Sequence, residues 1–64
     1  MSESLYMMEI EQILGQVSEV ACKEPGSIKF YGIKDWAIRK LTRHYGLNLD
    51  DARSEVAAAA GEEP

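Results

Sequence analysis

Several residues on which very small proteins often depend are scarce in this chain of 64 residues. It has one cysteine, Cys22, which excludes an intramolecular disulfide, and one histidine, His44. A structural zinc site typically uses four ligands from cysteine and histidine, so the chain does not supply one. A small domain without these cross-links relies on good helix packing or on self-association.

Long apolar runs are also missing. No run approaches the roughly 18 residues that a membrane-spanning helix needs. The first residues, MSESLYMMEIEQ, carry acids where a signal peptide would carry basic residues. A single unpaired cysteine fits a reducing compartment. These absences indicate a cytoplasmic protein that does not enter a membrane.

Recognisable catalytic and metal-binding motifs are absent as well. His44 has no serine, cysteine or carboxylate at a catalytic spacing, and a catalytic base needs an oriented partner. Cys22 lacks the cationic setting that activates a thiol. Asp50 and Asp51 favour a helix start over a metal site, because hard cations take six or more oxygen ligands. With no glycine-rich phosphate loop either, we expect no enzymatic activity, no metal and no cofactor.

What the chain does contain is ordinary for a globular protein. Hydrophobic residues make up 45% and charged residues 28%. The length permits one domain, so residues 1–64 are predicted to form a single helical domain.

The first predicted helix covers about residues 4–23, with Ser2 or Ser4 as its N-cap. Pro25 and Gly26 then favour a turn. At 100° per residue the apolar side chains share one arc, and they are Tyr6, Ile10, Ile13, Leu14, Val17, Val20 and Ala21.

The second helix is predicted at about 33–45. The preceding segment, SIKFYG at 27–32, is expected to be an extended linker whose Ile28 and Phe30 plug the bundle, because an isolated strand has no partner. Asp35 is placed in the first turn and Gly46 just after the last. The face predicted to be buried holds Ile33, Ala37, Ile38, Leu41 and Tyr45.

The third helix is predicted at about 48–60, where Asn48 can cap and Leu47 can form a hydrophobic staple. Its apolar stripe is Leu49, Ala52, Val56, Ala59 and Ala60. Gly61 ends the helix, and residues 61–64 are expected to fray. The three segments predict an all-α fold, a small three-helix bundle with a tight Gly-Leu corner at 46–47.

Residues 38–57 resemble the helix-turn-helix motif of DNA-binding proteins. Gly46 matches the turn glycine, Ala52 matches the small position of the second helix, and apolar residues surround the turn. The resemblance implies a transcriptional regulator whose second helix enters the major groove. Thr42 and Glu55 depart from the pattern, since small apolar and inward-facing apolar residues are usual there.

Charge favours a plain helical corner over DNA recognition at this motif. The early exposed positions of the third helix hold Asp50, Asp51, Ser54 and Glu55, with only Arg53 to offset them. DNA affinity depends on neutralising phosphates with lysine and arginine, and the net charge of the chain is −4.

The net charge conceals two regions of opposite sign. Residues 29–46 hold five of the seven basic residues and one acid, a net charge of +4. The rest of the chain holds two basic residues and ten acids, a net charge of −8. Complementary regions of this kind favour a homodimer.

Trp36 is predicted to lie among cations on the face of the second helix that points away from the core. Arg39, Lys40 and Arg43 follow it at i+3, i+4 and i+7, spacings that place all four side chains on one side. Tryptophan and arginine are enriched at binding hot spots. The alternative is that Trp36 folds over the edge of the core and that Arg39 and Lys40 stack on it.

The leading hypothesis is therefore a small non-enzymatic interaction protein: an adaptor, an inhibitor or a regulatory subunit. It would bind a protein partner through Trp36, Arg39, Lys40 and Arg43, or through its acidic ends. The alternative is a nucleic-acid-binding regulator that uses the same cations as phosphate contacts.

Overall fold

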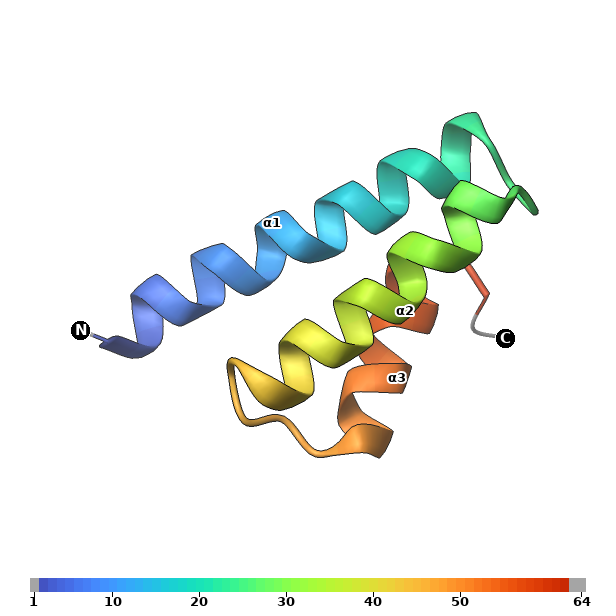
Figure 1. The fold of residues 1–64 in the computed structure, drawn as a ribbon. Helices are drawn as coiled ribbons and strands as arrows, with labels where there is room; N and C mark the ends of the chain where they lie inside the picture. The colour runs from blue at the N-terminus through green and yellow to red at the C-terminus, as the bar shows by residue number, and fades with distance from the viewer. Residues whose placement is uncertain (1, 63–64) are drawn as a thin grey trace.

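The computed structural model describes the backbone of residues 2–62 and the side chains of residues 7–62. It consists of three helices, α1 (Ser2–Lys23), α2 (Ile28–Arg43) and α3 (Leu49–Ala59), and the described part of the chain contains no strand. Each helix contacts the other two. The predicted all-α three-helix bundle is thus confirmed (Figure 1). Within residues 2–62, no helix is long and apolar enough to cross a membrane.

The core is built from matching pairs of residues. To the central cluster, each helix contributes two buried side chains that lie four residues apart, about one helical turn. Small Ala37 and Ala52 let the backbones approach closely, and Leu41, Val17 and Val56 are the largest fully buried side chains. The six residues of this cluster are Ile13, Val17, Ala37, Leu41, Ala52 and Val56.

The first helix follows its predicted apolar arc. Ile13, Val17 and Val20 are buried, while Ile10 and Leu14 pack against the core from its edge. The helix begins at Ser2 rather than near residue 4. The predicted contribution of Tyr6 to the core lies outside the described side chains, as do the caps proposed at Ser2 and Ser4.

The extended linker predicted at residues 27–32 is wrong, because α2 begins at Ile28. Ser27 caps the helix: its Oγ accepts a hydrogen bond from the Phe30 amide at 3.1 Å and donates one to the Glu24 carbonyl at 2.7 Å. Phe30 is buried as predicted, but from within a helix, and Ile28 is 92% exposed instead of plugging the bundle. Asp35 accordingly lies in the middle of α2, not in its first turn.

The second helix also ends earlier than predicted, at Arg43. The Gly-Leu corner follows: Gly46 adopts a φ of 77°, a left-handed conformation that glycine tolerates without strain. The Leu47 amide donates to the Leu41 carbonyl at 3.0 Å, and the Leu47 side chain packs against the core.

The third helix has both predicted end signals. Asn48 Oδ1 accepts from the Asp51 amide at 2.9 Å, which confirms Asn48 as the N-cap. At the other end the Gly61 amide donates to Ala58 and the Glu62 amide to Ala57, the paired bonds of a Schellman motif. These bonds direct Glu62 back toward the start of α2, and Leu49 in the predicted apolar stripe remains 49% exposed.

Candidate protein-binding surface on the second helix

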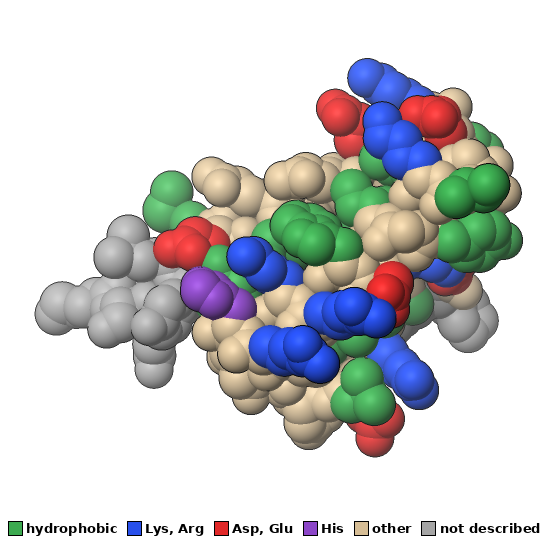
Figure 2. Space-filling model, in the orientation of Figure 1, with side chains coloured by type: hydrophobic (Ala, Val, Ile, Leu, Met, Phe, Trp, Pro, Cys, Tyr) green, Lys and Arg blue, Asp and Glu red, His purple; other side chains and the backbone are tan. Residues whose placement is uncertain are grey.

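The four residues predicted to bind a partner lie together on α2. Trp36, Arg39, Lys40 and Arg43 line one shallow pocket of about 270 Å³, and His44 completes its wall. In Figure 2 lysine and arginine side chains and the histidine gather over the C-terminal half of α2. We call these five residues the Trp36 surface. Helical spacing alone accounts for their arrangement, since Ala37 and Leu41 turn the opposite side of α2 into the core.

Trp36 is the exposed aromatic residue of this surface. Its exposed fraction is 39%, so part of the ring packs against the protein and part faces solvent. Within residues 7–62, the cation–π contacts lie elsewhere: the Lys34 ammonium sits 4.6 Å from the Phe30 ring centroid and 5.2 Å from that of Tyr31. No side chain of the described residues places a cation over the Trp36 ring in this way.

The cations of the Trp36 surface differ in their ion pairing. Arg39 Nε lies 3.2 Å from Asp35 Oδ2, an i,i+4 pair in which both side chains are exposed. Lys40 and Arg43 make no ion pair within the described part of the chain. Since exposed pairs contribute little, Arg39 also retains most of its capacity for another partner.

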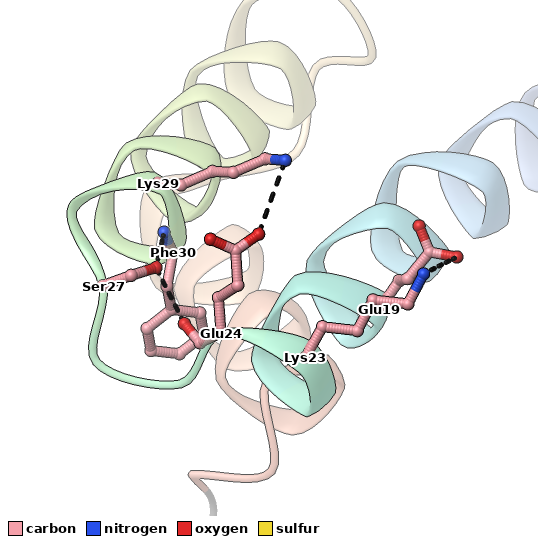
Figure 3. A network of polar contacts seen from close by, with 6 residues as sticks. All are labelled: Glu19, Lys23, Glu24, Ser27, Lys29 and Phe30. Carbon is pink, nitrogen blue, oxygen red and sulfur yellow. Dashed lines mark hydrogen bonds and ion pairs between the residues drawn. The ribbon is translucent and has the colours of Figure 1, made fainter.

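The cations in the N-terminal half of α2, in contrast, form ion pairs with acids of neighbouring segments. Lys29 Nζ lies 3.6 Å from Glu24 Oε2 across the turn between α1 and α2 (Figure 3). Lys34 reaches the end of α3, where its Nζ lies 2.9 and 2.7 Å from the two carboxylate oxygens of Glu62. Its side chain is only 19% exposed. These contacts join α2 to its neighbours in the bundle.

His44 stands at the C-terminal edge of the Trp36 surface and follows the last residue of α2. Its ring packs edge-on against Tyr45, with 4.8 Å between the centroids. Tyr45 is itself held by its hydroxyl, which donates to Glu9 Oε1 of α1 at 2.5 Å. The corner that positions His44 is therefore tied to the first helix.

The start of α3 carries exposed acids, as the sequence predicts. Asp50, Asp51 and Glu55 are all exposed. A recognition helix places these early positions closest to the phosphates and base edges of DNA. The chain between α2 and α3 covers residues 44–48, longer than the usual three- or four-residue turn of the motif.

The other polar residues considered from the sequence do not form a chemical centre in the described part of the chain. Cys22 is an exposed free thiol on the outer side of α1. Within the described residues, no three histidine, cysteine or acidic side chains come together as a metal ion would require.

A second concave surface, not identified from the sequence, lies between α1, the Gly-Leu corner and α3. It is lined by residues from three separate segments: Met7, Ile10, Glu11, Leu14, Leu47 and Glu55. A periodicity within one helix cannot show it, because it exists only where these segments meet.

Comparison of the chain with protein-family models, with curated proteins and with solved structures found no match. Its function is therefore inferred from the chemistry of its own surface.

Proposed function

We propose that this protein is a small non-enzymatic interaction module that binds a protein partner through Trp36, Arg39, Lys40 and Arg43. Such a module acts as an adaptor, an inhibitor or a regulatory subunit. The observation that carries the proposal is the 39%-exposed Trp36 in a shallow pocket whose other walls are Arg39, Lys40, Arg43 and His44. Tryptophan and arginine are the residue types most enriched at interface hot spots.

The chemistry of the Trp36 surface specifies the partner's side of the interface. Lys40 and Arg43 make no ion pair within residues 7–62. Their charges can therefore pair with carboxylates of a partner. An apolar or aromatic side chain beside those carboxylates would cover the exposed part of Trp36. We therefore expect an acidic partner surface with an apolar centre.

A matched set of variants tests the proposal. The tagged protein, Trp36→Ala and Arg43→Glu are used to capture partners from a lysate of the source organism, with Arg53→Glu on α3 as the control for charge reversal. We expect a protein that is retained by the wild type and by Arg53→Glu and is lost with both α2 variants. A partner that is retained equally by all four proteins contradicts the assignment of the binding surface.

Nucleic-acid binding is the second candidate, favoured by the same three cations and by the resemblance of residues 38–57 to a helix-turn-helix motif. It predicts an affinity for duplex DNA that falls steeply with salt and depends on Arg39, Lys40 and Arg43. The exposed acids Asp50 and Asp51 oppose it. A salt titration with labelled duplex DNA separates the two: the protein-binding proposal expects no specific complex at any salt concentration.

The homodimer expected from the sequence is also a proposal. A symmetric pair could place the +4 region of each copy against part of the −8 region of the other. Sedimentation equilibrium at micromolar concentration is expected to give twice the 7.1 kDa mass of the chain, with dissociation as salt rises. A mass of 7.1 kDa throughout this range contradicts self-association.

A further inference from the structure

The second concave surface has an apolar floor and an acidic rim. Met7, Ile10 and Leu14 follow one another at i, i+3 and i+7 along α1, and Leu47 of the corner faces them. Glu11 and Glu55 stand at the edges, one on α1 and one on α3. The space enclosed is about 450 Å³. We call this surface the α1 groove.

The groove is open because α1 is longer than the helices that pack against it. Its 22 residues span about 33 Å, whereas the 11 residues of α3 span about 17 Å. In Figure 1 the N-terminal part of α1 extends past the corner between α2 and α3. Along the same helix, Ile13 and Val17 are buried in the core cluster, while Met7 remains 57% exposed.

The charges around the groove select its occupant. No cation is among its lining residues, and Glu11 and Glu55 make no ion pair within the part of the chain that the structure describes. A second copy that packed its own α1 groove against this one would bring these carboxylates close to their equivalents, which is unfavourable. A segment with lysine or arginine on both sides of an apolar stripe would instead pair with both edges.

We propose that the α1 groove binds an amphipathic helix of a partner protein whose apolar stripe is flanked by lysine or arginine. An apolar floor that presents residues at helical spacing suits a helix laid into a groove. The flexible thioether of Met7 can adapt to the side chain that enters. This site is separate from the Trp36 surface, so the protein would join an acidic surface of one partner to a basic helix of another.

The probe for this site is a fluorescein-labelled synthetic peptide of 18 residues, with leucine on one face and lysine on both flanks. A second peptide keeps the leucine face and carries glutamate in place of lysine. Fluorescence anisotropy is measured with the full chain, with Met7→Lys and with Met8→Lys. Met7 and Met8 are neighbours with nearly equal exposed fractions, 57% and 59%, but only Met7 lines the groove.

We expect the lysine peptide to bind the wild-type chain and the glutamate peptide to bind at least tenfold more weakly. Met7→Lys should weaken the lysine peptide at least tenfold, whereas Met8→Lys should change its affinity less than threefold. Glu11→Gln should weaken it more than Glu19→Gln, which alters an acid of α1 outside the groove. Trp36→Ala should leave it unchanged, so failure here is distinguishable from failure of the Trp36 surface.

Three results would overturn the proposal. Equal binding of the two peptides would show that charge does not select the occupant. Equal effects of the Met7 and Met8 variants would show that the peptide binds outside the groove. A dimer in sedimentation equilibrium that Met7→Lys dissociates and Met8→Lys does not would assign the groove to a second copy of this chain.

Discussion

Both halves of α2 contain basic and aromatic residues, but these residues make different contacts in the two halves. In the N-terminal half, Lys29 and Lys34 pair with Glu24 and Glu62, and Lys34 also covers two aromatic rings. In the C-terminal half, Lys40 and Arg43 have no ion pair within residues 7–62, and the aromatic residue beside them is 39% exposed.

Position on the helix explains the difference. Lys34 follows Phe30 by four residues and precedes Leu41 by seven, so it lies on the same side as two buried residues. Its ammonium therefore meets the end of α3. Lys40 and Arg43 lie on the side of Trp36, and both side chains are exposed. A cation that faces a neighbouring helix stabilises the fold, and one that faces solvent is free to bind a partner.

The largest expected effect is a difference in stability between two variants in the N-terminal half of α2, one at a buried residue and one at an exposed residue. Phe30→Ala removes a ring that is 6% exposed and should cost roughly 3–5 kcal/mol of unfolding free energy. A chain of this length has roughly 3–10 kcal/mol in total, so the variant should be largely unfolded. Ile28→Ala, at a position 92% exposed, should change stability by no more than about 0.5 kcal/mol. Circular dichroism melts of both variants provide the measurement, and equal melting temperatures would contradict the helical start at Ile28.

Trp36→Ala tests the second half. Since part of the ring faces solvent, we expect a loss of about 1 kcal/mol of stability, close to an ordinary surface change. The free protein should show tryptophan emission that soluble acrylamide quenches readily, and its single tryptophan makes the reading unambiguous. A blue-shifted emission in the wild type, together with a collapsed melt in the variant, would identify Trp36 as a core residue. The proposed hot spot would then be lost.

Alanine variants of Lys34 and Lys40 allow a direct comparison of the two halves of α2. Lys34→Ala removes the ion pair to Glu62 and the cation–π contacts, and should cost about 1 kcal/mol. Lys40→Ala removes no ion pair within the described residues and should alter stability by less than about 0.5 kcal/mol. Urea denaturation is the suitable measurement, because guanidinium is a salt and would screen the pair. Equal stabilities of the two variants would show that the Lys34 pair contributes nothing to the fold.

The sequence predicts features that depend on one helix more reliably than features that depend on several. The apolar period placed Ile13, Val17, Ala37 and Leu41 in the core, and the same arithmetic placed Trp36, Arg39, Lys40 and Arg43 on one side. The sequence did not predict that α2 begins at Ile28. The alternating pattern at residues 28–30 and a glycine inside the helix both argue against a helix there, and these signals outweighed the capping signal of Ser27.

The α1 groove required the structure, for a different reason. Its floor combines α1 with Leu47, and its rim adds Glu55 of α3. The relative lengths of the helices decide whether Met7 is covered. Those lengths and contacts are properties of the packed bundle, and no single segment contains them.

The smallest expected effect lies at the boundary between the two halves, where Asp35 pairs with Arg39. Asp35→Asn removes an exposed i,i+4 pair and should cost only about 0.3–0.5 kcal/mol of stability. It also frees Arg39 and removes the one acid of the region from 29 to 46. If the Trp36 surface binds an acidic partner, the affinity for the captured protein should rise about twofold, in line with the small energy of the pair. The gain should shrink as salt is raised, because it is electrostatic. Titration calorimetry at two salt concentrations measures it, with Asp51→Asn on α3 as a control that makes the same change of charge. Weaker binding by Asp35→Asn would mean that the carboxylate holds Arg39 in its binding geometry, and the boundary would then belong to the binding surface rather than to the fold.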